Sequence, residues 1–444
     1  MNKLFATAAV SALLAATAVA QPLTLRDAAD EALARNPEIV AAGSETEAAR
    51  ARLSQARATW LPIIDASLNA SRSDNPVFVF ASLLEQGRFG PEHFDPAFLN
   101  NPPVTQNDRA TLNVRYAFFD QMRRFNMNKQ AARGVERARS AAEEARQRIL
   151  TEVITRFYGL TMAEQRRAVA AEAVRAAEAA TKATRDKAEQ GLVVESDRLA
   201  AEVQLAQFRQ QEIEAAGDAE IARAALAMTL QRPIAEPIAV DSTLPDKTFS
   251  PVDITAATEQ ALKRRGELAS AEAARAAAEF QLKTARGSLL PRLDGYASWG
   301  ASSPNLSNFN SDRTMGFIAS IDVFNGSRYA QIAEARAGVD GARAMETMMR
   351  DKVVMETVTA WHRANAARQQ LDVAAIAAEQ AASAARIVQD RYENGLTTIT
   401  EELRAQTALV GARLQLLAAR HQYITGYAEL LRATGGLHDI DPFL

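Results

Sequence analysis

Apolar residues recur with helical spacing through two long stretches that contain no proline. Proline is absent between Pro103 and Pro233 and again between Pro304 and Pro442, and proline is excluded from helix interiors. Within these stretches the apolar positions step by three and four residues or by seven: Val135, Ala138, Ala142, Ala145 and Ile149, then Leu403, Val410, Leu414, Leu417 and Ile424. The pattern predicts four long helices, over about 121–190, 195–231, 327–393 and 398–434.

The first of these helices is far longer than an ordinary globular helix. About 68 residues from Arg123 to Gln190 keep a helical composition, which corresponds to a rod of roughly 100 Å. A coiled coil or a helical barrel is the usual context of such a helix. Periodicity alone leaves a solid rod and a hollow barrel open. His421 falls on the second seam, where we expect a packed or polar-layer residue rather than a ligand.

Two short segments in each half alternate apolar and polar residues, which is the spacing of a half-buried strand. We expect strands over about 63–72, 109–119, 292–302 and 313–324. Their length and aromatic residues are typical of outer-membrane barrel strands, although a soluble sandwich shows the same alternation. Four strands cannot close a membrane barrel, because known closed barrels begin at ~8 strands. Three chains would supply twelve, so the pattern favours an obligate oligomer.

The chain contains two similar halves. Pro62 and Pro291 lie 229 positions apart in matching segments, and further along Gly191 and Gly395 match at an offset of 204. The difference requires an insertion in the first half, between about Arg72 and Asp108. We expect a first repeat over 21–231, a second over 252–436 and a short tail over 437–444. A gene duplication would explain the repeat without specifying a function.

Each repeat places a proline where helix must become strand. Pro62 follows Trp60 and Leu61, and Pro291 follows a pair of leucines. Both prolines are therefore predicted helix-to-barrel junctions.

The insertion, Asn75 to Asp108, is rich in Pro, Asn and Phe and is typical of a long surface loop. Its aromatic residues could cap or plug a pore mouth, but we favour packing of the loop onto itself.

The N-terminus has the features of a secretory signal peptide over residues 1–20. Lys3 precedes an apolar run, and Ala18, Val19 and Ala20 form a cleavage site before Gln21. A membrane anchor is the alternative, but the run is shorter than the roughly 20 residues of a spanning helix. The chain has no cysteine, so neither disulfides nor a cysteine-linked lipid anchor are expected.

Charge and motifs exclude several function classes. The net charge is −3 with both signs mixed, and no basic stripe indicates nucleic-acid binding. Common hydrolase, phosphate-loop and dinucleotide-binding motifs are absent, and the four histidines lack metal-ligand spacing. We therefore expect no enzyme activity, no cofactor and no metal site.

The duplication, the paired proline junctions and the two Gly-Leu turns resemble the TolC-like outer membrane factors over nearly the whole mature chain. The resemblance implies an α+β membrane protein: a homotrimer in which four strands per chain form a shared 12-stranded β-barrel in the outer membrane of a Gram-negative bacterium. It also implies a long α-helical coiled-coil barrel in the periplasm. Residues 232–251 are the candidate equatorial linker.

The resemblance also assigns the two turns to the periplasmic tips. Gly191, Leu192, Gly395 and Leu396 match the motif that meets the periplasmic adaptor (membrane fusion) protein, although a plain hairpin turn would also need the glycines. Ser196 and either Thr398 or Thr400 are candidate N-caps.

Acidic residues beyond the second tip ring the closed aperture in some relatives. Glu401 matches the first such position and Asp197 is its repeat counterpart, whereas Arg404 departs from the second and puts a double ring in doubt. A ring of carboxylates would favour cations. A solvated acid at a helix start, which the helix dipole favours, explains the residues equally well.

The resulting hypothesis is an outer-membrane exit duct of a tripartite efflux pump or type I secretion system. Its expected partners are two further copies of the chain, the adaptor, an inner-membrane RND or ABC transporter and outer-membrane lipid. The alternative is an exported coiled-coil scaffold without channel activity. A self-sufficient porin fits poorly, because it has no need of such long helices. The exported substrate and the transporter class stay open.

Overall fold

The computed structural model describes residues 22–241, 244–245, 249 and 252–444. The predicted signal peptide and part of the predicted linker lie outside these residues. The described chain forms two compact units. We call them the helical unit (residues up to Val40, Ala145–Arg264 and Met355–Leu444) and the strand unit (Ala41–Glu144 and Arg265–Val354).

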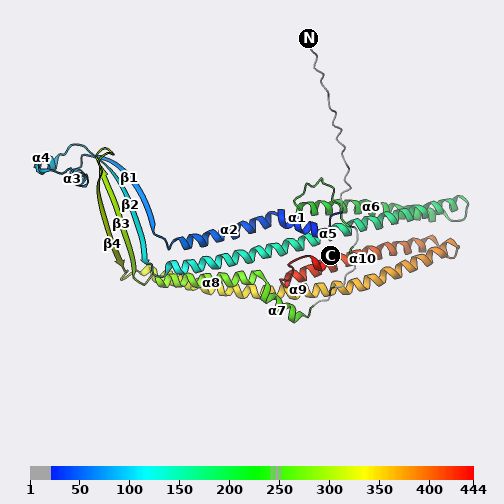
Figure 1. The fold of residues 1–444 in the computed structure, drawn as a ribbon. Coiled ribbons are helices and arrows are strands. Elements are labelled where there is room, and N and C mark those ends of the chain that lie inside the picture. The colour runs from blue at the N-terminus through cyan, green and yellow to red at the C-terminus, as the bar shows by residue number, and fades with distance from the viewer. Residues whose placement is uncertain (1–21, 242–243, 246–248, 250–251) are drawn as a thin grey trace, which may run out of the picture. The chain divides into compact units, whose positions relative to one another are not determined.

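The strand unit contains one antiparallel sheet with the strand order β1-β2-β3-β4 (Figure 1). Its strands are β1 (Ile63–Ser73), β2 (Thr105–Phe119), β3 (Arg292–Ser303) and β4 (Asn310–Ser320). The prediction of four strands is thus confirmed, but the bounds of β2 and β4 differ. Strand β2 begins about four residues earlier than expected, since Thr105 pairs with Ser73. Strand β4 stops at Ser320, which already pairs with Arg292, the first residue of β3.

Helices of the strand unit pack through small side chains. They are α8 (Gly266–Gly287) and the parts of α2 (Pro37–Ala58), α5 (Arg123–Glu189) and α9 (Gly326–Glu393) that fall in this unit. Ala49 of α2 packs against Val135 and Ala138 of α5. At Gly266 the α8 backbone comes so near α5 that an added Cβ would lie 2.8 Å from the Ser140 carbonyl oxygen. Close approach of this kind requires small residues.

The insertion after β1 is not an irregular loop, which corrects the sequence prediction. It contains α3 (Pro76–Glu85), the 3-10 turn η1 (Pro91–Phe94) and α4 (Pro96–Asn100). Asn75 and Asp95 cap α3 and α4 through their side chains, and a proline follows each cap. Phe80, Phe89, His93, Phe94 and Phe98 form a chain of ring contacts with centroids 4.8–5.3 Å apart.

The helical unit is built from two long hairpins, α5 with α6 and α9 with α10 (Figure 1). Its remaining elements are α1 (Leu25–Arg35), α6 (Glu195–Thr229), α7 (Ile254–Arg264), α10 (Ile399–Ala433) and the 3-10 turn η2 (Asp441–Phe443). The main core joins α1, α5, α6 and α10. Its largest fully buried side chains include Ile149, Leu150, Ile154, Leu160, Leu226 and Ile424.

The segment between the halves and the C-terminal tail both join this core. Phe249 stacks on Tyr427 at 4.0 Å, and its backbone N–H donates to the Tyr423 hydroxyl at 2.7 Å. The Tyr158 hydroxyl donates to the Phe443 carbonyl at 2.6 Å, and burial raises the pKa of Tyr158 to about 12. These contacts hold both segments against the helices.

His421 lies in the helical unit at a close approach between α10 and α5. A Cβ added at Gly159 would meet its Nε2 atom at 3.8 Å. Burial lowers the pKa of His421, so the imidazole is held neutral. Among the described residues, no group of acidic or histidine side chains could hold a metal ion. No helix of the described chain combines the length and the apolar character needed to cross a membrane.

Candidate functional site: the strand faces, the junctions and the helical tips

The sheet has one polar face whose side chains bind one another across the strands. Asp65 accepts hydrogen bonds from Asn113 at 2.9 Å and from Arg115 at 3.0 Å. Arg109 on β2 forms an ion pair with Asp312 on β4 at 2.8 Å. Register partners point to the same side of an antiparallel sheet, so these residues share one face. The face therefore presents a mainly polar surface that carries both charge signs.

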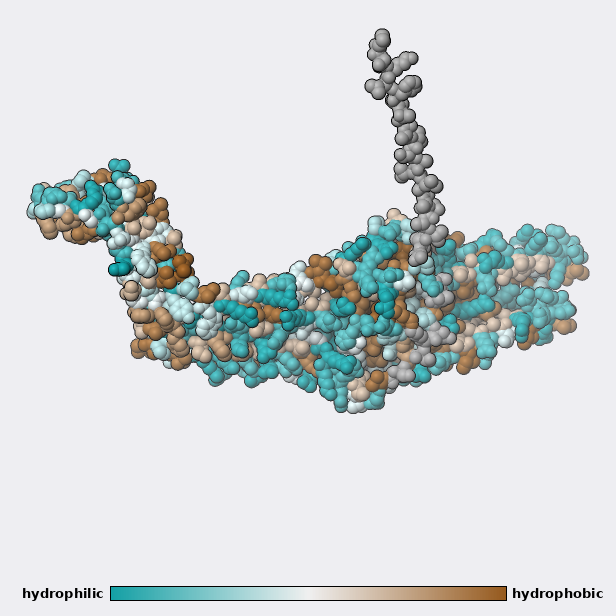
Figure 2. Space-filling view, viewed as in Figure 1, coloured by the Kyte–Doolittle hydropathy of each residue, from teal (hydrophilic) through white to brown (hydrophobic). Residues whose placement is uncertain are grey.

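The opposite face is apolar and strongly exposed. Leu68, Met315 and Phe317 are 64%, 74% and 73% exposed, and Trp299 is 51% exposed. Figure 2 shows apolar residues gathered over the strands. Exposed apolar patches of this kind mark a membrane or protein interface. The sheet thus separates an apolar surface from a polar one across a single layer.

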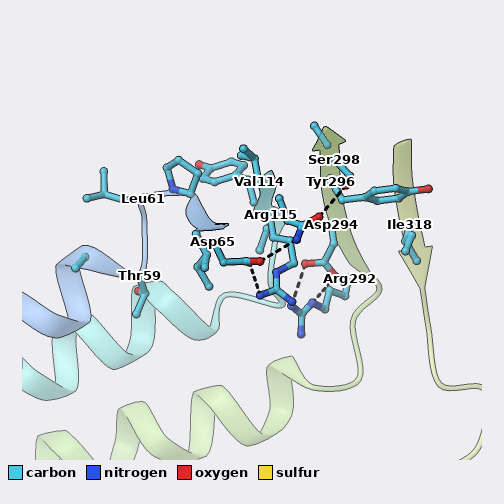
Figure 3. A pocket seen from close by; sticks show the side chains of 18 residues that line it. Thr59, Leu61, Asp65, Val114, Arg115, Arg292, Asp294, Tyr296, Ser298 and Ile318 are labelled. Atoms are coloured by element: carbon cyan, nitrogen blue, oxygen red, sulfur yellow. Dashed lines mark hydrogen bonds and ion pairs between the residues drawn. The ribbon is translucent and has the colours of Figure 1, made fainter. Parts of the chain in front are cut away.

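A groove of about 980 Å³ lies on the polar face beside the helix-to-strand junction. Figure 3 shows Asp65 with Arg115 and Asp294 with Arg292 along its wall. Arg292 and Asp294 approach to 2.6 Å. Because the lining charges occur in opposite pairs, they compensate one another within the groove.

Both predicted junction prolines lie between a helix and a strand. Pro62 lies between the end of α2 at Ala58 and the start of β1, and Pro291 lies between the end of α8 at Gly287 and the start of β3. Proline restricts the residue before it to extended geometry, which favours a strand over further helix.

Where the chain returns from β2 to α5, Gln121 has a left-handed φ of 63°. A Cβ on Gly287 would overlap the Gln121 carbonyl oxygen, so this close approach requires glycine.

Arg124 connects three chain segments at the first junction, and sequence analysis missed it. Its side chain is almost fully buried and pairs with Asp120 at 3.1 Å. It donates to the carbonyl oxygens of Ala117 and Thr59 and stacks over Trp60 at 4.6 Å. The end of α2, the end of β2 and the start of α5 thereby share one cation.

Arg328 occupies the corresponding place in the second half, 204 positions later. It pairs with Asp322 at 2.5 Å and donates to the Ser288 carbonyl oxygen. The arginine recurs at the repeat offset of 204, and in the two halves it follows an aspartate by four and six residues. This recurrence is the signal that would have found Arg124 and Arg328.

Replacing Arg124 by methionine should destabilise the junction by about 3–5 kcal/mol, because Asp120 keeps a nearly buried charge without its partner. The measurement is thermal unfolding of the purified protein in detergent. Arg123→Met is the matched control, since Arg123 is exposed and its loss should leave the midpoint unchanged. Equal midpoints for the two variants would show that Arg124 is not the junction's anchor.

The two predicted tips form similar turns. Gly191 and Gly395 have left-handed φ values of 75° and 71°, and the following N–H of Leu192 reaches back to the Lys187 carbonyl at 2.9 Å. This hydrogen bond closes a Schellman-type helix end, which favours glycine. Leu192 and Leu396 are 69% and 68% exposed. Both tips therefore present an unburied leucine.

One N-cap prediction is wrong and the other is confirmed. Ser196 lies inside α6, whose N-cap is Val194 without a side-chain hydrogen bond. Thr398, and not Thr400, caps α10 by accepting from the Glu401 N–H. In the first turn of α6 the Asp197 N–H donates to the Val194 carbonyl oxygen at 3.0 Å.

The aperture candidates lie at the starts of α6 and α10. Glu401 is half-exposed and pairs with Arg404 at 3.0 Å. Asp197 lies in the first turn of α6. The residue that departs from the family pattern, Arg404, thus compensates the first acid instead of forming a second acidic ring. Whether these residues line a pore stays a prediction.

Glu402 is a buried acid at the second tip that sequence analysis missed. Only 5% of the residue is exposed, and its carboxylate accepts from Gln406 at 3.1 Å. Burial, and next the negative charge of Glu393, raise the pKa of Glu402, while Lys187 opposes the shift. The signal was present: Glu402 shares an i, i+3, i+4, i+7 stripe with Ile399, Leu403 and Gln406.

Glu402→Gln should remove a pH dependence of the second tip. Since the folded pKa is raised, the wild-type tip loses stability as pH rises from the ordinary carboxyl range through the raised value, and glutamine stays neutral throughout. The measurement is the ratio of wild-type to variant amide exchange in the first turns of α10 at each pH. The ratio should rise with pH for Glu402→Gln and stay flat for Glu401→Gln. A flat ratio for both would contradict the buried-acid account.

Comparison with known proteins settles the family. The family model for outer membrane efflux proteins matches residues 28–230 and 257–436. The chain belongs to the outer membrane efflux protein family. The alkaline protease secretion protein AprF of Pseudomonas aeruginosa is 24% identical over 94% of this chain and 86% of its own length. Outer membrane protein TolC of Escherichia coli is 25% identical over 44% of this chain and 43% of its own.

A solved structure has the same fold. The CmeC outer membrane channel of Campylobacter jejuni superposes with a TM-score of 0.78 at 19% identity, over 93% of this chain and 85% of that one. As an outer membrane efflux protein of the TolC type, the chain is an outer-membrane channel protein that extends into the periplasm. Members of this family are channels and not enzymes.

Proposed function

We propose that three copies of this outer membrane efflux protein form an exit duct that passively conducts substrate from the periplasm to the outside. The observation that carries the proposal is the four-stranded sheet with one polar face, one apolar face and two edge strands, β1 and β4. An open strand edge cannot face lipid, because its N–H and C=O groups find no water there. Pairing of β1 with β4 of a neighbouring chain satisfies both edges.

Closure by three chains gives a barrel of twelve strands, within the range of known membrane barrels of ~8 strands or more. The apolar face then meets lipid and the polar face lines the lumen. We assign the repetition of helix, strand and long helix in the two halves to an internal duplication, which gives each chain two such wall segments. A soluble scaffold, the alternative, would leave Met315 and Phe317 in water and would be released without detergent.

In the proposed duct, the long hairpins of the three chains form a helical tube. Ile213 and Ile221 of α6 are 74% and 70% exposed, and Met345 and Met348 of α9 are 65% and 63% exposed. Burial of such side chains contributes about 25 cal/mol per Å², which favours packing of each hairpin against neighbouring chains. A ring of hairpins around a hollow centre provides these contacts.

The partners at the tips follow from the exposed leucines. We propose that Gly191, Leu192, Gly395 and Leu396 bind a periplasmic adaptor, which connects the duct to an inner-membrane RND or ABC transporter. An exposed apolar side chain at a glycine turn is an anchor that a groove on a partner can bury. The proposed duct can serve an efflux pump or a type I secretion system. The family is named for efflux, and the relative AprF is named for protease secretion.

Leu192→Asp combined with Leu396→Asp should abolish export while leaving the assembled protein in the outer membrane. A charge in the adaptor contact costs desolvation that a leucine does not, whereas neither side chain packs in the described chain. The measurement is drug susceptibility or cargo secretion together with oligomer content. Leu192→Met with Leu396→Met is the control and should retain export. Normal export by the aspartate variant would exclude these tips as the docking site.

Glu401→Gln and Arg404→Gln should shift ion selectivity in opposite directions if Glu401 rings the aperture. Removing Glu401 lowers cation preference, while removing Arg404 frees the Glu401 carboxylate from its ion pair and raises it. The measurement is the reversal potential in planar bilayers under a salt gradient. Identical reversal potentials in all three proteins would place Glu401 outside the conduction path.

A further inference from the structure

Glu85 and Gln86, at the end of α3, fix the insertion after β1 to the polar face of the sheet. Glu85, the last residue of α3, accepts hydrogen bonds from Asn107 on β2 at 3.0 Å and from Ser302 on β3 at 3.3 Å. Its carboxylate also lies 3.4 Å from Arg109. The backbone carbonyl of Glu85 accepts from the Asn310 side chain on β4 at 2.8 Å. Three of the four strands are therefore tied to the end of α3.

The strand register fixes the side on which α3 lies. Arg109 is opposite Ser302, and Ser302 is opposite Asn310. Asn107 is two residues from Arg109 on the same strand and so points to the same side. Arg109 in turn pairs with Asp312 across the polar face. All contacts of Glu85 with the sheet thus belong to the polar face and none to the apolar one.

The contact is packed and internally satisfied. Val79, Ser82, Leu83 and Gln86 form one stripe of α3, and each is at most 5% exposed. Gln86 donates to the backbone carbonyl of Gln106 at 2.8 Å and to the Asn107 side chain at 3.0 Å. Ser302 is fully buried beneath it. The side chains of Glu85 and Arg109 are 38% and 26% exposed at the edge of this contact, and the buried residues around them define one position for the end of α3.

We propose that α3 is a constriction built into the outer mouth of the duct, latched to the lumen wall by Glu85 and Arg109. The inference rests on the proposed function, because the polar face becomes the lumen wall only when the barrel closes. Helices α3 and α4 lie at the end of the sheet where β1 and β2 are joined (Figure 1). The insertion therefore narrows the exit from inside and sets the size of the solutes that leave.

Site-directed labelling tests the constriction, because the chain has no native cysteine. Ser67→Cys places a thiol on the polar face, two register rows from the Arg109 row on the side away from α3. Intact cells are treated from outside with a polyethylene-glycol maleimide. Loss of the charge-assisted contacts of Glu85 should raise the detached population, and hence labelling of this lumen thiol, about tenfold in Glu85→Ala. Glu85→Gln should give an intermediate rate.

Two comparisons make the outcome decisive. Glu92→Ala removes an exposed acid from the same insertion and should leave the rate at the wild-type value. Removal of residues 76–104 should give the fastest labelling. Equal rates for the wild type, Glu85→Ala and the deletion, in protein that is assembled in the outer membrane, would overturn the constriction.

A second thiol position distinguishes a wrong constriction proposal from a wrong duct proposal. Leu68→Cys places the thiol on the apolar face, where lipid should shield it from a small charged maleimide. Rapid labelling of the Leu68→Cys variant would contradict the barrel and therefore the proposed function. A shielded thiol in that variant, together with unchanged labelling rates in the Ser67→Cys series, would contradict only the constriction.

Discussion

The arrangement depends on one constraint: a four-stranded sheet cannot hide its edges. Strands β1 and β4 each carry a row of backbone donors and acceptors on the outer side of the sheet. In lipid each unpaired group costs several kcal/mol, so the apolar face is usable only once the edges are paired. In the proposed duct, oligomerisation is therefore a condition for membrane insertion rather than a later addition.

At the junctions the chain changes from helix to strand. A helix satisfies its hydrogen bonds within itself and a strand satisfies them with neighbours, so the backbone must change partners within a few residues. Pro62 and Pro291 end the helical pattern, and Arg124 and Arg328 bind the carbonyl oxygens freed there. The cations occupy the points where backbone acceptors would otherwise lack partners.

The long helices satisfy their own backbone hydrogen bonds, but they bury little apolar surface within one chain. Alanine-rich seams such as Ala49 against Val135 and Ala138 bury little surface per contact. Stability therefore depends on length and on neighbours. In the proposed duct, the exposed isoleucine and methionine side chains of the long helices would be buried against neighbouring chains.

Periodic features were predictable from the sequence, and local ones were not. The strands and long helices follow from spacings repeated over many residues, and each additional turn strengthens the signal. The helices of the insertion are short, and their sequence signal is limited to Asn75-Pro76 and Asp95-Pro96, which are equally typical of turns. The charge of a side chain does not reveal its burial, so the only sequence signals for Arg124 and Glu402 were positional: a recurrence at the repeat offset for Arg124, and the stripe with Ile399 and Leu403 for Glu402. Ser196 failed as a cap because α6 begins one residue before it.

Interchain cross-linking between the edge strands tests the central claim most directly. One cysteine is held at Ser67 on β1 while a second is moved along β4 from Ser311 to Ala319 in the cysteine-free chain. The account predicts that one register gives covalent dimers and trimers and no larger species, because the third link closes the ring. Absence of interchain cross-links in every register, or a ladder that continues beyond three chains, would contradict it.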